Sequence, residues 1–263
     1  MAKKPEPDAG QLARGWNEFW PEVVQRIRAR TPARIFSGRA GAAYRTATQM
    51  ELREAHACAR DAVGAELNLE RDLGKTLVDE WSLFEVSTQA ASKQEYLLRP
   101  DMGRTLSHSG RAILLNRCPA GNQLQIVIGD GLSVTAVSAQ VPALLPRLQE
   151  GARERGLAVG QTFVVRHCRV GILNDVGELL SPEVAVLLIG ERPGLATAES
   201  LSAYLAYRPN QGHTDAQRNL ISNIHARGVG PQEAARRILD LAAQMMEKRI
   251  SGFQLKEQLA IGK

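Results

Sequence analysis

A carboxylate and a guanidinium stand side by side after a short apolar segment. Residues 184–189 have the length of a buried strand, Gly190 permits a turn, and Glu191 and Arg192 follow. Ligands of open α/β sheets bind beyond the carboxyl ends of the strands. Glu191 can accept hydrogen bonds there, and Arg192 can bind an anionic group through two N–H donors. A structural ion pair is the alternative, and for adjacent surface charges it is the commoner arrangement.

A second candidate loop is Gly129-Asp130-Gly131-Leu132-Ser133, which lies between a predicted strand and a predicted helix. Its backbone N–H groups could bind phosphate or amide oxygens of a ligand. No Lys-Ser/Thr pair follows the glycines, so the loop is not a P-loop, and the G-x-G-x-x-G spacing of dinucleotide-binding proteins is absent. From its composition alone, a tight turn is the better interpretation.

One cysteine has a basic neighbour. Arg169 follows Cys168 and could lower the pKa of its thiol enough to give a reactive thiolate. We expect a packed small apolar side chain instead. No ordered Ser-His-Asp set stands out, and the three cysteines lack C-x-x-C spacing. The sequence therefore predicts no catalytic residue, disulfide framework or metal site in this chain.

Three successive strand–loop–helix units are expected to position the two loops. Such a succession predicts an α/β fold with a parallel, Rossmann-like sheet. The expected elements are a strand at 124–128, a helix opening at Ser133, a helix at 141–155 with Gly156 as its cap, a strand at 162–170, a strand at 184–189, a helix from Thr197 through Leu205, and a last helix from Pro231.

The chain divides into three predicted parts. Residues 1–30 form a tail and a helix, residues 31–115 form a helical N-terminal part, and residues 116–263 form the α/β domain that would bind a ligand. In the first part, Trp16 and Trp20 belong to an apolar helical stripe that needs a partner surface.

Composition limits the partners. The chain has 33 Lys and Arg against 28 Asp and Glu, but the basic residues are spread out and aromatic residues make up 5%. We therefore expect no nucleic-acid partner. No apolar run approaches the roughly 20 residues that span a bilayer, and no signal peptide is evident, so we expect a cytoplasmic protein without a membrane partner.

Several motifs in a fixed order resemble one known family, the small (light) subunit of ethanolamine ammonia-lyase. The resemblance covers roughly residues 31–252, and motifs in series are more specific than any one of them. The motifs are Ser37-Gly38-Arg39-Ala40-Gly41, Arg99-Pro100-Asp101-Met102-Gly103-Arg104, Ile128-Gly129-Asp130-Gly131-Leu132-Ser133, Leu187-Leu188-Ile189-Gly190-Glu191-Arg192-Pro193-Gly194 and Arg218-Asn219-Leu220-Ile221-Ser222-Asn223-Ile224-His225.

This resemblance implies an adenosylcobalamin-dependent lyase that converts ethanolamine to acetaldehyde and ammonia by a radical rearrangement. The chain would cover the cofactor at the interface with a large subunit that holds the substrate pocket, within a hetero-oligomer of several large and small subunits. The stripe at Trp16 and Trp20 is the leading candidate for the large-subunit contact. In the family a longer N-terminal extension can direct the enzyme to a bacterial microcompartment, and here that extension is short.

The resemblance also implies cofactor contacts. Val170, Glu191 and Leu220 match the family's small-subunit contacts to the cofactor. A corrin ring carries amide side chains, which need acceptors such as a carboxylate or a backbone carbonyl. The remaining expected contacts are Asp130, Gly131 and Ser133 at the rim of the site and Arg192 beside Glu191.

His225 lies in a near-match to D-x-H-x-x-G, the motif by which other cobalamin proteins supply a histidine to cobalt. Asn223 replaces the aspartate, and an amide orients an imidazole poorly compared with a carboxylate. The resembled family keeps dimethylbenzimidazole on cobalt. We therefore expect His225 to be a hydrogen-bonded structural histidine.

Two other classes of function remain open from the sequence. The chain could be a stand-alone α/β module that binds a corrinoid or a nucleotide without catalysis of its own. It could also be a hydrolase or transferase that uses Asp130, Glu191 and His225, although these residues form no ordered catalytic set.

Overall fold

The computed structural model describes residues 22–31 and 33–257, which fall into two compact units on either side of the His56/Ala57 boundary. Each unit is described by itself. The first contains helix α1 (Glu22–Ala29), which buries none of its residues, and an antiparallel pair, β1 (Arg39–Ala40) with β2 (Ala43–Tyr44). Trp16 and Trp20 lie outside the described residues, and helix α2 (Thr46–Gly64) contains the boundary.

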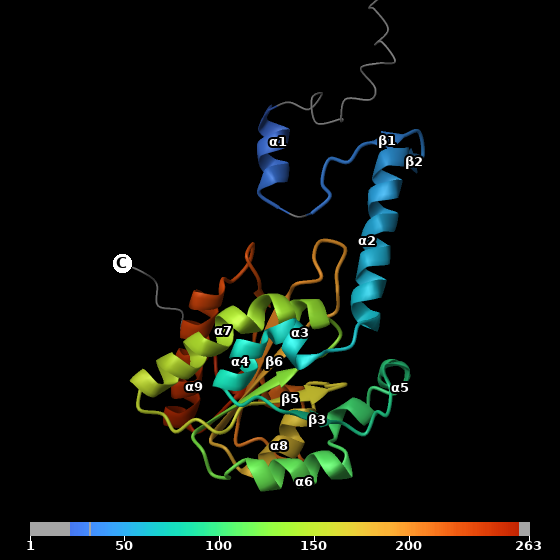
Figure 1. The fold of residues 1–263 in the computed structure, drawn as a ribbon. Coiled ribbons are helices and arrows are strands. Elements are labelled where there is room, and N and C mark those ends of the chain that lie inside the picture. The colour runs from blue at the N-terminus through green and yellow to red at the C-terminus, as the bar shows by residue number, and fades with distance from the viewer. Residues whose placement is uncertain (1–21, 32, 258–263) are drawn as a thin grey trace, which may run out of the picture. The chain divides into compact units, whose positions relative to one another are not determined.

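A six-stranded sheet organises the second unit (Figure 1). Its spatial order is β3-β5-β4-β6-β7-β8. The first four strands are parallel, whereas β7 and β8 are antiparallel to their neighbours. The α/β prediction is confirmed, with a mostly parallel sheet. The strands are β3 (Glu85–Ser87), β4 (Leu124–Gly129), β5 (Phe163–Arg166), β6 (Val184–Gly190), β7 (Leu201–Tyr207) and β8 (Asn219–Ile224).

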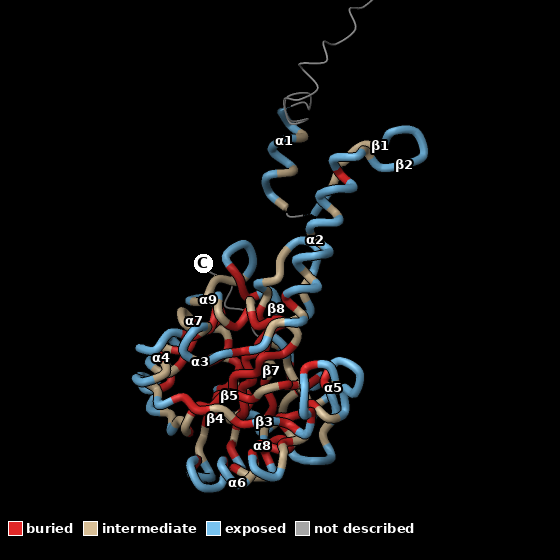
Figure 2. The backbone as a smooth tube through the Cα atoms, turned by 45° about the vertical axis from the view of Figure 1, so that its right-hand side comes forward, coloured by how far each residue is buried: buried red, intermediate tan, exposed pale blue. Residues whose placement is uncertain are grey.

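Helices cover both faces of this sheet. Alternate residues of β4 and β6 face opposite sides, so every residue of these strands is buried, and buried residues concentrate in the strands (Figure 2). One face packs against α3 (Leu69–Leu73), α4 (Lys75–Glu80), α7 (Val134–Glu154) and α9 (Pro231–Lys248). The other packs against α6 (His108–Arg117) and α8 (Ile172–Leu180). Helix α5 (Lys93–Leu98) and the 3-10 turn η2 (Met102–Arg104) lie between β3 and α6 in the sequence.

Helix ends follow the sequence signals closely. Ser133 caps α7, with its side chain accepting the N–H of Ala136, and α9 begins at Pro231 after Gly230, as predicted. The helix that opens at Ser133 and the one predicted for 141–155 are a single helix, α7, which contains Pro142 and Pro146. Among the described residues, no helix has both the length and the apolarity to cross a membrane.

The helix predicted from Thr197 through Leu205 is wrong. The segment 201–207 is strand β7, which pairs antiparallel with β6 along its whole length. Leu201, Ala203 and Leu205 pack on one face while Tyr204 packs on the other, which is the two-residue period of a strand. The third unit is therefore an antiparallel pairing, so the sheet is not parallel throughout.

Two other predicted boundaries differ. The strand expected at 162–170 ends at Arg166, because His167 adopts a left-handed backbone conformation with φ 55°. Strand β3 pairs with β5, so the sheet includes residues from the segment 31–115 that the sequence predicts as helical.

The crossover connections on either side of β4 run over opposite faces of the sheet. β4 leads through α7 to β5 across one face, and β5 leads through α8 to β6 across the other. The loops after the adjacent strands β4 and β5 therefore leave toward opposite faces. Asp130 and His167 are the first residues of these two loops, at the position where α/β proteins bind ligands.

Close backbone packing at this edge gives a stability test. A Cβ on Gly190 would lie 2.0 Å from the carbonyl oxygen of Ser133, which is backbone and cannot rotate away. We expect Gly190→Ala to lower the free energy of unfolding by about 3 kcal/mol. Urea denaturation of the full chain measures it. Gly64→Ala is the control, since no atom lies within 4 Å of its built Cβ; an equal effect of both substitutions would contradict the packing argument.

Candidate functional site

A cavity of about 460 Å³ lies beside α8. Its lining comes from separate segments: η2, the turn that precedes α8, strand β7, and the stretch that contains the short helix η3 (Asp215–Gln217). The residues that matter for its chemistry are Arg104, Arg169, Val170, Tyr204, His213 and Arg218.

Three expected cofactor contacts meet around Tyr204. Val170 lines the cavity together with Tyr204. The hydroxyl of Tyr204 donates to Oε1 of Glu191 at 3.4 Å, and Tyr204 is the register partner of Leu220 on the edge strand β8. Burial, followed by the charge of Glu191, raises the pKa of Tyr204 to about 12, so the hydroxyl keeps its proton and remains a donor.

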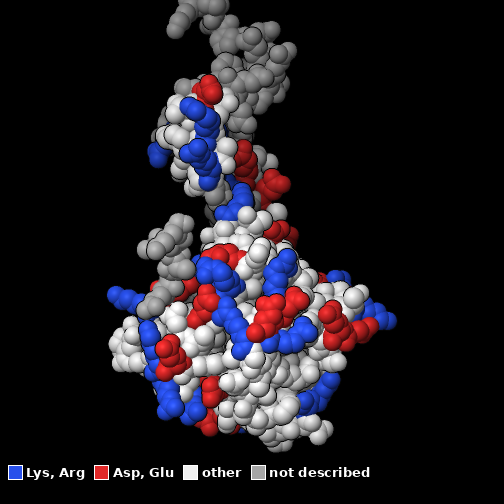
Figure 3. Space-filling view, turned by 90° about the vertical axis from the view of Figure 1, so that its left-hand side faces the viewer, with Lys and Arg blue, Asp and Glu red and all other residues white. Residues whose placement is uncertain are grey.

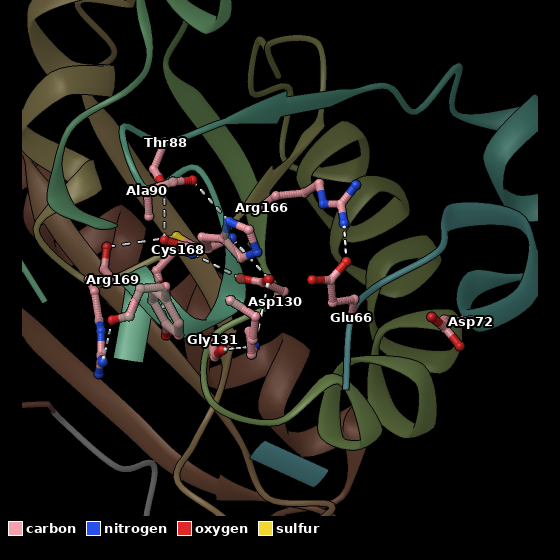
Figure 4. A network of polar contacts seen from close by, with 12 residues as sticks. Glu66, Asp72, Thr88, Ala90, Asp130, Gly131, Arg166, Cys168 and Arg169 are labelled. Carbon is pink, nitrogen blue, oxygen red and sulfur yellow. Dashed lines mark hydrogen bonds and ion pairs between the residues drawn. The ribbon is translucent and has the colours of Figure 1, made fainter. Parts of the chain in front are cut away.

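Asp130 is not on the surface of this site. It is 1% exposed, and its two oxygens accept the backbone N–H groups of His167 at 2.9 Å and Cys168 at 2.8 Å (Figure 4). The ammonium of Lys93 lies 4.0 Å from the same carboxylate and donates to the carbonyl of Gly131 at 3.2 Å. Asp130 therefore joins the loop after β4 to the loop after β5.

Hydrogen bonds to three other segments of the chain hold the loop after β5. The hydroxyl of Thr88 donates to the carbonyl of His167 at 3.1 Å, and that of Tyr96 donates to the carbonyl of Cys168 at 3.0 Å. The N–H of Arg169 donates to the carbonyl of Gly103 at 2.8 Å. These bonds fix the turn that brings Arg169 and Val170 to the cavity.

The loop with Glu191 and Arg192 rests on the start of α7. The hydroxyl of Ser133 donates to the carbonyl of Ala198 at 2.5 Å, and the side chain of Gln140 donates to the carbonyl of Glu199 at 3.3 Å. Arg192 is exposed, and its side chain forms no hydrogen bond or ion pair with any residue in the described ranges. An ion pair between Glu191 and Arg192 is therefore not formed.

Gly131 permits the close approach of these loops. Its φ is 60°, and a Cβ there would lie 2.3 Å from the carbonyl oxygen of Gly190. The structure thus brings Val170, Glu191 and Leu220 together around Tyr204, while Asp130, Gly131 and Ser133 lie beneath the loops that carry Val170 and Glu191.

His225 has no free ring nitrogen. Its Nδ1 accepts the backbone N–H of Arg227 at 3.2 Å, so the ring proton is on Nε2, which donates to the side-chain oxygen of Asn223 at 2.6 Å. This agrees with the expected hydrogen-bonded structural histidine. Within 22–31 and 33–257, no group of three or more His, Cys, Asp or Glu side chains could hold a metal ion.

The remaining charged surface shows no large single-sign area on the face drawn in Figure 3, where basic and acidic side chains alternate. Helix α9 illustrates this alternation: Arg236 pairs with Glu233 and Asp240, and Arg237 pairs with Glu257. Sequence reasoning missed Tyr204, which lies in the segment mispredicted as a helix, and did not connect Arg104 with Arg169 and Arg218.

The fold and the cavity define the chain as an α/β protein with a polar cavity beside α8. Its sequence matches the family of the ethanolamine ammonia-lyase light chain (EutC) over residues 21–256. The chain belongs to this family, which is a subunit family of a lyase, and the resemblance seen in the motifs is confirmed.

Named relatives support this membership. The ethanolamine ammonia-lyase small subunit of Clostridium perfringens is 41% identical over 235 residues, which are 89% of this chain and 78% of that protein. The ethanolamine ammonia-lyase small subunits of Listeria monocytogenes serotype 4a and Clostridioides difficile are each 40% identical, with the same two coverages. A small subunit implies a large-subunit partner.

Thiol labelling tests whether Cys168 is a nucleophile. Burial raises the pKa of Cys168 well above its usual range, Asp130 adds to this, and Arg169 only partly opposes it; burial raises the pKa of Cys118 to about 11. Cys58 is exposed. At pH 8 we expect iodoacetamide to modify Cys58 about a hundredfold faster than either buried thiol, because only the thiolate reacts. Peptide mass spectrometry measures the rates, and fast labelling of Cys168 would restore the nucleophile hypothesis.

Proposed function

We propose that this chain is the adenosylcobalamin-covering small subunit of an ethanolamine ammonia-lyase that converts ethanolamine to acetaldehyde and ammonia. Family membership supports the subunit assignment. The observation that supports the covering role is the convergence of Val170, Glu191 and Leu220 around Tyr204, beside a 460 Å³ cavity.

The residues at this position fit the cofactor's chemistry. The carboxylate of Glu191 can accept amide N–H groups from the corrin's side chains. Leu220 is 47% exposed on the edge strand and can provide apolar contact, and Val170 stands at the cavity wall. Adenosylcobalamin, when bound, supplies a cobalt–carbon bond whose homolysis starts the radical rearrangement.

In this proposal, residues of the chain bind the cofactor and hold its contacting groups in position. Tyr204 donates to one oxygen of Glu191, which fixes the direction of the carboxylate and leaves its second oxygen available for a ligand. Asp130 and Ser133 act as positioning residues, because they hold the loops of Val170 and Glu191. Arg192 is exposed beside Glu191 and is available for a ligand's anionic or carbonyl oxygen.

In the assembled enzyme, this chain and the large subunit would enclose the cofactor between them. The parallel strands β3 to β6 serve as a Rossmann-like support for the cofactor loops, and the large subunit closes the site from the other side. Several large and small subunits form the hetero-oligomer, in the cytoplasm or in a bacterial microcompartment, with the stripe at Trp16 and Trp20 as a large-subunit contact.

The first experiment measures acetaldehyde formation. A large subunit from a relative's enzyme is supplied with ethanolamine and adenosylcobalamin, with and without this chain. We expect activity only when both proteins are present, because each contributes one side of the cofactor site. A large subunit that is active with its own small subunit but gains nothing from this chain would favour a stand-alone corrinoid- or nucleotide-binding module.

A second prediction concerns Glu191. Replacing it with alanine removes a charged acceptor, so we expect affinity of the assembled complex for adenosylcobalamin to fall by about tenfold or more. Equilibrium dialysis measures the affinity, and gel filtration checks that assembly is unchanged. Glu199→Ala is the matched control, because Glu199 lies on the same loop and, in the part of the chain that the structure describes, only its backbone is hydrogen-bonded. Equal affinities of the Glu191→Ala and wild-type complexes would refute the contact.

A further inference from the structure

The cavity beside α8 carries an excess of positive charge. Arg104, Arg169 and Arg218 line it, and Asp215 is its only acidic lining residue in the part of the chain that the structure describes. Asp215 is already paired with Arg218. The guanidinium of Arg104 is exposed and has no hydrogen-bond or ion-pair partner within the described ranges. The cavity is therefore built to receive negative charge.

Three lining residues carry buried N–H groups that have no partner among residues 22–31 and 33–257. These are Nε of Arg169, Nε of Arg218 and Nδ1 of His213. The amide nitrogen of Asn210 donates to Nε2 of His213 at 3.1 Å, and its amide oxygen accepts the N–H of Gly212, so the imidazole proton is on Nδ1. Burial and the charge of Arg218 lower the pKa of His213, which favours the neutral form of the ring. All three groups are thus unsatisfied donors behind the cavity wall, and a ligand could accept from them only if these side chains shifted, so the exposed guanidinium of Arg104 is the donor that meets the cavity directly.

Two of the arginines are held in place without a ligand. The guanidinium of Arg169 lies over the ring of Tyr96 at 4.3 Å and donates to the Tyr96 carbonyl at 3.3 Å. Arg218 donates to Asp215 and, at 2.8 Å, to Asn174. Because these contacts already fix the side chains, an anion would bind with little additional ordering.

We propose that this cavity binds a phosphate group, namely the phosphodiester in the nucleotide arm of the cofactor. The assignment rests on the proposed function, since Val170 lines the same cavity. A phosphate offers several oxygens in different directions, which suits guanidinium and imidazole donors from separate segments. The 460 Å³ volume exceeds that of one phosphate ion, which favours a phosphate within a larger molecule.

One test uses the full chain and inorganic phosphate. We expect phosphate to raise the thermal unfolding midpoint of the chain relative to sodium chloride at equal ionic strength, and Arg104→Gln to remove most of this gain. Arg104→Lys keeps the charge and should retain part of it. Arg147→Gln is the control, because Arg147 is exposed on α7 and, among the described residues, its side chain bonds only to the carbonyl of Ala143. No phosphate-dependent gain in the wild-type chain would overturn the phosphate site.

A second test separates the cofactor from free phosphate as the source. The complex with a large subunit is titrated with adenosylcobalamin and with adenosylcobinamide, which lacks the phosphodiester and the base. We expect Arg104→Gln to weaken adenosylcobalamin binding by about tenfold and to leave adenosylcobinamide binding unchanged.

Other results of the corrinoid titration would lead to different conclusions. Equal weakening of both corrinoids, or of neither, would overturn the assignment to the cofactor's phosphodiester. A complex that binds neither corrinoid, with phosphate still stabilising the chain in an Arg104-dependent way, would refute the proposed cofactor role and assign the cavity to free phosphate.

Discussion

The buried carboxylate of Asp130 holds the carboxyl edge of the sheet together. A carboxylate inside a protein is costly unless hydrogen bonds and an opposite charge replace water. Here two backbone N–H groups and the ammonium of Lys93 do so. Burial lowers the pKa of Lys93 while Asp130 opposes that effect, so the two buried charges depend on each other. Asp130 accepts the backbone N–H of His167. The left-handed backbone conformation of His167 ends β5 and turns the chain toward Arg169 and Val170.

Gly131 and Ser133, in the same loop as Asp130, support the loop after β6 that carries Glu191. Gly131 lets the loop lie against the end of β6, and Ser133 holds the segment that follows Glu191. Five residues, from 129 to 133, therefore support the loops after both β5 and β6. This explains how a loop with glycine, aspartate and serine can resemble a ligand loop in sequence while its side chains make internal hydrogen bonds.

Local signals in the sequence predicted the elements that depend on local physics. Short apolar runs located β4 and β6, and proline after glycine located the start of α9. β7 was missed because its conformation depends on pairing with β6, which outweighs the capping tendency of Thr197. The position of Glu191 beyond a strand end was accessible from the sequence, whereas Val170 was predicted as the last residue of a strand that ends at Arg166. The cavity was not, because its arginines come from segments separated by dozens of residues and only the folded sheet brings them together.

The polar groups of the site restrict the choice of ligand more than the volume of the cavity does. Around Tyr204 the free acceptor is the carboxylate of Glu191, which suits ligand N–H groups. Within the cavity the exposed guanidinium of Arg104, beside Arg169 and Arg218, has no protein partner in the described residues, which suits an anion. A small anion would use only the second set, and a neutral amide only the first. A molecule with peripheral amides and a phosphodiester would use both, and the exposed side chain of Leu220 on the edge strand leaves apolar surface for its remaining contacts.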